Sequence, residues 1–366
     1  MIRSIRVSIF LAALASVPLF VACRPQKPAP LVKECPSQPL SMPRDLYTHD
    51  WAQTEWWYYT GHLRGDDGKN YGFELTFFRY RVDPRQLDLP APEGVTGYMS
   101  NFAVLTENPV SYRHDNRIIL EGPAAGGAAD RYRVFVGDWS VEGDDRSQRL
   151  RAANLEMAID LVVEPDKDYV LHGPGGIFHK SDGLGNYYFS NPRMKARGTL
   201  KIKGRSVRVE GMAWFDREFG FLGPAPAHGW DWFSLQLDDR TEYMIYRLHR
   251  HEGDIEPNSR ACRIDPDSHE ECVPVTDAQM TPLRYWKSPH TGGNYPVSWK
   301  VRIKKLGLDV TIVPVLLDQE LHSPGLTYWE GSCKVTGQPA NGRAYLELVG
   351  YGRAPLLEFT DYNPRK

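Results

Sequence analysis

The sequence contains none of the short motifs that identify several common classes of enzyme. No G-x-S-x-G segment is present to place a serine nucleophile, and no G-x-x-x-x-G-K-[ST] loop is present to bind phosphate. No two cysteines stand in the CxxC spacing that structural zinc sites use. These absences argue against α/β-hydrolases, P-loop nucleotide enzymes and zinc modules, and we expect neither a cofactor nor a metal.

The chain also lacks an excess of basic residues. Lys and Arg number 44 and Asp and Glu number 46, so the formal net charge is −2. A basic stripe is what draws a protein to a phosphate backbone, and none is visible here. We therefore expect no nucleic-acid partner.

Long apolar runs are scarce, and the run at the N-terminus predicts export. Arg3 and Arg6 precede a largely apolar stretch over residues 7–21, which is too short to favour a membrane-spanning helix. We therefore predict that residues 1–22 are a signal peptide. Ala22 before Cys23 is the pattern of a bacterial lipoprotein, in which Cys23 becomes lipidated; the alternative is an ordinary secretory peptide.

The segment after Cys23 is rich in proline. Residues 23–44 carry little apolar area, and we predict that they form an extended, lipid-anchored tether. Arg24 in place of Asp favours, by its similarity to lipoprotein sorting signals, the outer membrane. The expected location is the periplasmic side of a bacterial envelope.

Only four cysteines remain beyond Cys23. Cys262 and Cys272 enclose a short polar loop, and in an oxidising compartment we predict that they form a disulfide. Such a bond would stabilise the fold by roughly 3 kcal/mol on the chain-entropy estimate. Cys35 and Cys333 are left as a second, weaker candidate pair.

What the sequence has in quantity is aromatic residues, glycine and proline. Aromatic residues make up 12% of the chain, which also contains 32 Gly and 28 Pro, and few windows show the apolar stripe of a helix. Candidate strands recur at a spacing of 8 to 15 residues without helices between them, which indicates an all-β fold. A chain of 366 residues is long enough for two domains.

One hairpin pattern occurs twice. Residues 55–63 form an aromatic strand that a Gly-Asp-Asp-Gly turn joins to a return strand over residues 72–82. Residues 229–237 and 242–248 repeat this arrangement after the Pro/Gly-rich joint at 222–227. We predict two related halves, and closing each into a β-barrel would avoid exposed edges. The expected domains are residues 45–222 and 223–360.

The segment from Trp214 to Gly220 concentrates aromatic area and charge. On a strand, Trp214, Asp216 and Glu218 share one face, and Phe215, Arg217 and Phe219 share the other. A carboxyl buried against Trp214 would have a raised pKa and could act as a general acid, so Asp216 and Glu218 are the candidate catalytic residues. The alternative is that Asp216, Arg217 and Glu218 form ion pairs that fix the joint between the halves.

Aromatic and histidine side chains supply the candidate ligand-binding set. Trp and Tyr lining a cavity suit a long apolar ligand with few polar anchors, and the alternative is that they pack the core. His172 and His179 flank the glycine-rich loop at 173–176, where they either line an opening or are solvated. The candidate ligand-binding residues are Glu55, Trp57, Tyr59, His179, Tyr188, Trp214, His228, Trp230, Trp232 and Tyr246.

Several of these segments together resemble the AttH/CrtC family of lipocalin-like proteins. The resemblance begins with Glu55-Trp56-Trp57-Tyr58-Tyr59 and runs through residues 211–220, 229–237 and 342–348, covering about 45 to 355. It implies two tandem lipocalin-like, calycin-type antiparallel barrels packed together. The family includes carotenoid 1,2-hydratases, which add water to an isoprenoid double bond without a cofactor, and secreted proteins associated with ABC-transporter permeases.

Two departures from the hydratase branch bear on activity. Trp214 stands where that branch has a tyrosine or leucine two residues before the acid, and its His and Trp are not found around Tyr187 to Phe189. Our leading prediction is a monomeric envelope lipoprotein that binds an apolar, isoprenoid- or lipid-like molecule and serves an ABC transporter. The alternatives are a cofactor-independent hydratase or lyase with Asp216 as proton donor, and an acid–base hydrolase.

Overall fold

The computed structural model describes residues 38–82, 95–179, 185–221, 229–249, 254–323 and 326–352. Within these ranges the ordered structure is β-strand apart from short 3-10 helices, and no helix there is long and apolar enough to cross a membrane. The 3-10 helices are η1 (Arg44–Leu46), η3 (Pro174–Gly176), η4 (Val275–Asp277) and η5 (Lys304–Leu306). Cys23 and Cys35 lie outside the described residues.

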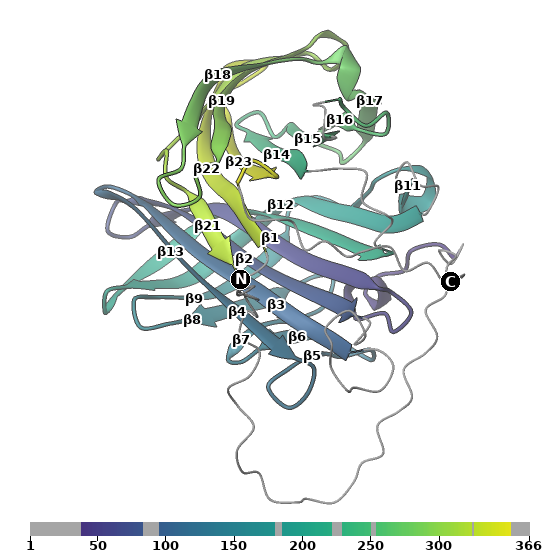
Figure 1. The fold of residues 1–366 in the computed structure, drawn as a ribbon, viewed down its shortest axis with the longest axis vertical. Helices are drawn as coiled ribbons and strands as arrows, with labels where there is room; N and C mark the ends of the chain where they lie inside the picture. Colours follow the sequence, from purple (N-terminus) through teal and green to yellow (C-terminus); the bar gives the residue numbers. More distant parts are fainter. Residues whose placement is uncertain are drawn as a thin grey trace, which may run out of the picture.

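The first half forms one large antiparallel sheet that curls toward a barrel (Figure 1). Its strand order is β4-β3-β2-β1-β13-β12-β9-β8-β7-β6-β5, with β10 and β11 also paired to β12. The strands are β1 (Thr54–Gly65), β2 (Asn70–Val82), β3 (Val95–Glu107), β4 (Val110–Leu120), β5 (Ala125–Gly127), β6 (Tyr132–Val136), β7 (Trp139–Gly143), β8 (Gln148–Ala153), β9 (Met157–Pro165), β10 (Val170–Leu171), β11 (Ile177–His179), β12 (Gly185–Ile202) and β13 (Arg205–Gly220).

The second half forms a separate antiparallel sheet, which also curls toward a barrel (Figure 1). Its order is β17-β16-β15-β14-β23-β22-β20-β19-β18, with β21 also paired to β22. The strands are β14 (Gly229–Leu237), β15 (Glu242–His249), β16 (Arg260–Ile264), β17 (Glu270–Pro274), β18 (Gln279–Lys287), β19 (Asn294–Ile303), β20 (Leu308–Pro314), β21 (Glu320–Ser323), β22 (Leu326–Gln338) and β23 (Gly342–Val349).

The two sheets share one scheme of strand pairing. In each, the first strand lies between its hairpin partner and the last strand of the same half, as β1 lies between β2 and β13 and β14 lies between β15 and β23. The repeated hairpin of the sequence therefore occupies equivalent places in both halves. This architecture confirms the predicted fold class, an all-β chain with two antiparallel barrels.

Strict alternation along the strands separates barrel interior from exterior. On β1, Trp57 and Tyr59 belong to the core of the first barrel, whereas Tyr58 belongs to an apolar cluster that also contains side chains of the second barrel. Successive strand residues point to opposite faces, so aromatic residues at every position must fill both. The first barrel thus has one aromatic face inside and another directed at its neighbour.

The layer between the barrels is built from these outward faces, and we call it the seam. In Figure 1 the second sheet arches over β1, β12 and β13 of the first. The seam contains one apolar cluster with members from both sheets: Tyr58, Val170, Tyr188, Trp214, Trp232, Met244, Tyr246, Cys262, Ile264 and Tyr345. A smaller cluster of Ala103, Leu321, Tyr328 and Val349 continues it. The barrels therefore share a buried apolar layer.

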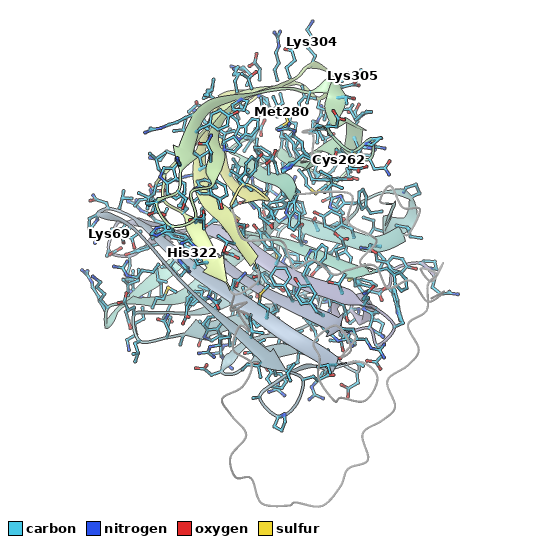
Figure 2. All side chains as sticks on the ribbon, in the orientation of Figure 1. Lys69, Cys262, Met280, Lys304, Lys305 and His322 are labelled. Atoms are coloured by element: carbon cyan, nitrogen blue, oxygen red, sulfur yellow. A yellow bond between two sulfur atoms is a disulfide. The ribbon has the colours of Figure 1, made fainter. Side chains whose placement is uncertain are left out.

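Polar contacts also join the barrels. The buried carboxylate of Glu242 accepts hydrogen bonds from Lys167 and Arg193, both of the first half. Asn116 of β4 donates to the carbonyl of His322 at 2.7 Å, and Figure 2 shows His322 on the side of the second barrel that faces the first, far from Lys304 and Lys305. Ion pairs and β21 thus fasten the seam at its margins.

Cys262 and Cys272 form a disulfide between directly paired positions of β16 and β17. Cys262 also contributes to the apolar cluster of the seam. Cys333 is a free thiol buried in the core of the second barrel, and its candidate partner Cys35 lies outside the described residues.

Candidate functional site

Asp216 lies in the seam with three neutral hydrogen-bond donors around its carboxyl group. Tyr188 donates to Oδ2 at 2.7 Å, while Trp214 at 2.7 Å and Ser190 both donate to Oδ1. Only 4% of Asp216 is exposed, and among the described residues no Lys or Arg lies within ion-pair distance of it. Asp216 is therefore not part of the ion-paired joint that was the alternative prediction.

The surroundings of Asp216 act on its pKa in opposite directions. Burial raises the pKa, while the electrostatic interaction with His172 and the hydrogen bonds from Ser190, Tyr188 and Trp214 lower it, and the net pKa lies above the ordinary aspartate value. A raised pKa favours the protonated acid, and the three donors stabilise the carboxylate once the proton has left. The group is suited to giving up and regaining a proton.

A chain of hydrogen bonds links Asp216 to the rim of the seam. Ser190, which donates to Asp216, is 2.6 Å from Nε2 of His172, and Nδ1 of His172 is 2.7 Å from the carboxylate of Glu270. His172 is buried, so it is not the solvated histidine that was one expectation, whereas 14% of the Glu270 side chain is exposed. The chain offers a route for protons between Asp216 and solvent.

Arg217 points into the first barrel, away from Asp216. Its guanidinium pairs with Glu55 at 2.5 Å and lies 4.0 Å from the ring centroid of Trp57. Glu55 also accepts a hydrogen bond from Arg79 at 3.0 Å and another from the amide of His49 at 2.9 Å. The predicted ion-pair function of Arg217 exists, but its partner is Glu55 inside the barrel, because alternation places Arg217 opposite Asp216 and Glu218.

Glu218 lies on the same face of β13 as Asp216, as predicted. Asn186 donates to its carboxylate at 2.6 Å, and 6% of the residue is exposed. Its charge, together with that of Asp216, acts on the hydroxyl of Tyr188. Glu218 and Asp216 therefore both act electrostatically on Tyr188.

Three further carboxyl groups in the seam were missed by the sequence reasoning. Glu74 of β2 accepts a hydrogen bond from Tyr328 of the second barrel at 2.8 Å, and Glu330 of β22 accepts one from Tyr58 of the first at 2.7 Å. Glu347 of β23 accepts from Trp230 at 3.0 Å. Each barrel thus supplies a tyrosine to a glutamate of the other.

These glutamates hold their protons unusually tightly. Burial raises the pKa of Glu74 and of Glu347 to about 8, and burial together with the charges of Glu74 and Glu347 raises that of Glu330 well above its ordinary value. The signal in the sequence is a single charged residue inside an apolar strand, as in Leu346-Glu347-Leu348. Such a residue predicts a buried acid but does not identify what it faces.

The structure divides the predicted ligand-binding residues into two groups. Those in the seam cluster are Tyr188, Trp214, Trp232 and Tyr246, with the half-buried Trp230 packed against them. Glu55, Trp57 and Tyr59 instead lie in the interior of the first barrel, where they are fully buried against other side chains. The side chain of His179 and all of His228 lie outside the described residues. The seam, not the first barrel, therefore unites the candidates.

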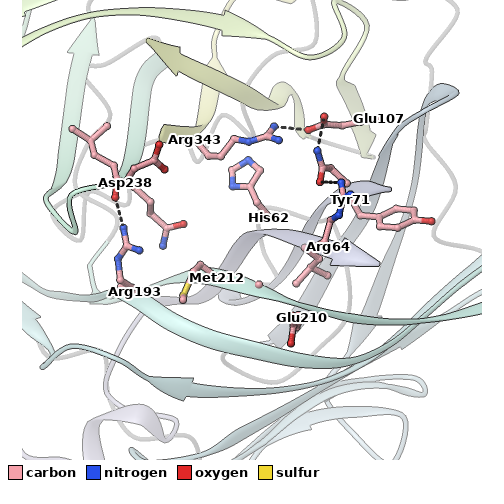
Figure 3. A pocket seen from close by; sticks show the side chains of 14 residues that line it. His62, Arg64, Tyr71, Glu107, Arg193, Glu210, Met212, Asp238 and Arg343 are labelled. Atoms are coloured by element: carbon pink, nitrogen blue, oxygen red, sulfur yellow. Dashed lines mark hydrogen bonds and ion pairs between the residues drawn. The ribbon is translucent and has the colours of Figure 1, made fainter. Parts of the chain in front are cut away.

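An open cleft of about 250 Å³ lies at one end of the seam (Figure 3). His62 and Met212 come from the first barrel and Asp238 and Arg343 from the second, and Asp216 is not in its wall. Burial followed by the charge of Arg343 lowers the pKa of His62 to about 3, so this imidazole is neutral. The cleft shows that the seam is open to solvent at this end.

Known proteins share this two-barrel architecture. The model of the family described as AttH-like matches residues 33–351. A crystal structure of a putative AttH from Nitrosomonas europaea is 30% identical, with a TM-score of 0.77, covering 88% of this chain and 99% of that one. Kievitone hydratase from Nectria haematococca is 17% identical, with a TM-score of 0.65, covering 85% and 93%. No curated protein matches the chain.

Proposed function

Because the chain belongs to the AttH-like family, whose two-barrel structure it shares, we propose that it is a cofactor-independent hydratase or lyase acting on a carbon–carbon double bond of an apolar molecule. The observation that carries the proposal is Asp216: a buried carboxyl in an aromatic layer, unpaired with Lys or Arg among the described residues, with three neutral donors on it. A structural neighbour that is itself named a hydratase agrees with this chemistry.

In the proposed reaction Asp216 is the general acid. Its proton passes to one alkene carbon, the π electrons form the new C–H bond, and a cation remains on the other carbon. Water then adds to the cation and returns a proton to the Asp216 carboxylate, so that alkene and water become an alcohol with no net change in the protein. While Asp216 is charged, Tyr188, Ser190 and Trp214 stabilise it.

Aromatic rings surround the place where the cation would form. Trp214 and Trp232 pack edge to face at 5.9 Å between centroids, and Tyr58 packs edge to face on Trp232 at 5.2 Å. Electron-rich ring faces attract a positive charge more strongly where water is excluded. Trp214 in place of the expected tyrosine or leucine therefore keeps both an aromatic face and a hydrogen bond to the acid.

The test is hydration of prenylated phenols and isoprenoid alkenes in ¹⁸O-labelled water, followed by mass spectrometry of the alcohol. Native protein should form labelled alcohol, and Asp216→Asn should be slower by roughly 10² to 10⁴-fold while still binding the alkene. Asn keeps the shape and most hydrogen bonds of Asp216, so loss of turnover reports the proton. A rate unchanged by the substitution would remove Asp216 from the chemistry.

The second candidate is a lipid-anchored carrier of an apolar ligand that serves an ABC transporter. It is favoured by the aromatic seam, in which Trp56, Phe178, Trp230 and Leu248 are only half-buried beside the cluster and can contact a ligand. In that case the native protein binds isoprenoids without converting them. The same labelled-water experiment separates the two functions.

A further inference from the structure

Of the three seam glutamates, Glu74 and Glu330 are fully buried and Glu347 is half-buried. Glu74 and Glu330 are both 0% exposed, and in each only Oε1 accepts a hydrogen bond, while Oε2 is buried without a partner among the described residues. Among the described residues, none of Glu74, Glu330 and Glu347 has a Lys or Arg within ion-pair distance. Buried polar atoms without partners are rare in proteins, and each one destabilises the free protein.

A third atom without a partner lies in the same place. The hydroxyl of Tyr112, on β4, is buried and makes no hydrogen bond within the part of the chain that the structure describes. The charges of Glu74 and Glu330, after burial, raise the pKa of this hydroxyl, which places Tyr112 within the field of both carboxyl groups. Three buried polar atoms without a hydrogen-bond partner among the described residues, on β2, β4 and β22, therefore mark a candidate position for a ligand.

Aromatic side chains form the rest of this position. Trp230 donates a hydrogen bond to Glu347. Burial and the charge of Glu347 together raise the pKa of the Tyr80 hydroxyl, so Tyr80 lies near the same glutamate. Phe78 stacks on Tyr80 at 6.0 Å, and both rings are half-buried, as are Trp230 and Glu347. Glu347 is therefore partly exposed beside aromatic rings, whereas Glu74 and Glu330 are closed off from solvent.

Charge and geometry limit the kind of ligand. The carboxylate oxygens of the three glutamates do not converge within the 4.8 Å that a shared metal ion requires, in the part of the chain that is described. Once ionised, these carboxylates would repel an anion. An organic cation is larger than a metal ion, is attracted to both carboxylates and ring faces, and would satisfy the unpartnered oxygens.

We infer that Glu74, Glu330 and Glu347, with the rings of Trp230 and Tyr80, form a subsite for a cationic centre carried on an apolar molecule. The inference rests on the proposed function, because the natural cation would be the carbon centre formed when Asp216 donates its proton to an alkene. Tyr58, paired with Asp216 across β1 and β13, donates to Glu330, so the subsite adjoins the acid. In this arrangement the glutamates stabilise the cationic intermediate, and Asp216 donates the proton to the alkene.

Binding of a cation should depend on pH. At neutral pH the glutamates hold protons, since burial raises the pKa of Glu74 and Glu347 to about 8, and a cation must displace them. Affinity should therefore rise from pH 6.5 to pH 9, with protons released at the lower pH. The titratable and charged groups that face the glutamates are Tyr58, Tyr80, Tyr112, Asp216, Tyr328, Cys333, Tyr345 and, through Tyr345, Arg343.

The probes are benzyltrimethylammonium and (2,2-dimethylpropyl)benzene, in which carbon replaces the charged nitrogen. Calorimetry with the full-length protein should show the cation binding roughly tenfold or more tightly than its neutral isostere at pH 9. The preference should shrink at pH 6.5, where buffers of different ionisation enthalpy report proton release. Equal binding of the two probes, or a preference independent of pH, would overturn the inference without any variant.

Substitutions locate the effect. Glu330→Gln and Glu74→Gln should each reduce the preference for the cation by roughly tenfold and leave binding of the neutral probe unchanged, whereas Glu271→Gln, at an exposed acid, should change neither. A cation preference that survives both seam substitutions overturns the inference. Asp216→Asn should keep the preference while losing alkene hydration, so failure of the proposed reaction and failure of the subsite give different results.

Discussion

Glu55→Gln tests the buried ion network that fills the end of the first barrel. Glu55 is fully buried and faces two guanidinium groups, Arg217 at 2.5 Å and Arg79 at 3.0 Å, with His49 at 3.2 Å. The substitution keeps the shape of the side chain and removes its charge. Arg217, which is itself 0% exposed, is then left as a buried cation without a counter-ion.

The pKa of Glu55 gives the size of the effect. Burial alone raises this pKa, but Arg217, His49 and Arg79 outweigh burial and lower it from 4.5 to about 2. That fall, at roughly 1.4 kcal/mol per pH unit, corresponds to about 3 kcal/mol of stabilisation at neutral pH. Removing one partner of a buried pair costs about 3–5 kcal/mol by general experience, which agrees.

The assay is urea unfolding at pH 7, followed by far-ultraviolet circular dichroism and tryptophan fluorescence. Glu55→Gln should lower the free energy of unfolding by about 3–5 kcal/mol. The matched control is Glu142→Gln, since Glu142 pairs with Arg151 at 3.2 Å with both side chains about 40% exposed, and its loss should cost less than about 1 kcal/mol. Similar effects of the two substitutions would refute the reasoning.

The lowered pKa of Glu55 also predicts how the stability of the native protein changes with pH. A carboxyl whose pKa is lowered on folding stabilises the protein above its unfolded pKa of 4.5, and this contribution is lost as pH falls toward 2. The native protein should therefore lose stability in that acid range, and Glu55→Gln should lose less. Equal acid sensitivity in both proteins would contradict the assignment.

Two further predictions concern the seam and the disulfide. Folding raises the pKa of Glu74 and Glu347 from 4.5 to about 8, so the folded protein holds protons that the unfolded chain has released. The free energy of unfolding should therefore fall as pH rises from about 4.5 to about 8, by at most about 1.4 kcal/mol per pH unit for each group. Glu74→Gln and Glu347→Gln should flatten that slope in urea titrations. Cys262→Ser should lower the free energy of unfolding by roughly 3 kcal/mol. A reductant should lower the free energy of unfolding of the native protein and leave that of Cys262→Ser unchanged.

Alternation along strands made part of the site predictable from the sequence. It placed Trp214, Asp216 and Glu218 on one face and Arg217 on the other, and the structure has Trp214 and Asp216 in hydrogen-bond contact within the seam. The repeated hairpin similarly predicted two related halves. Both results depend on local spacing, which the order of residues fixes directly.

Pairing between distant strands accounts for what was missed. Tyr58 and Glu330 are 272 positions apart, and Arg217 and Glu55 are 162 apart, so their contacts depend on which strands become neighbours and how the barrels meet. Period two assigns Trp57 to one face and Trp56 to the other, but it cannot distinguish a barrel interior from a barrel-to-barrel layer. The seam is therefore a property of the assembled fold and not of any strand.

The shared aromatic seam also bears on how the chain folds. A first barrel made alone would present Tyr58, Tyr188 and Trp214 to water as one continuous apolar surface, of the kind that drives aggregation. During synthesis that surface stays uncovered until β14, with Trp232, and β23, with Tyr345, have been made. The two barrels therefore resemble the halves of one cooperative unit, and neither half is expected to be a well-behaved protein when expressed by itself.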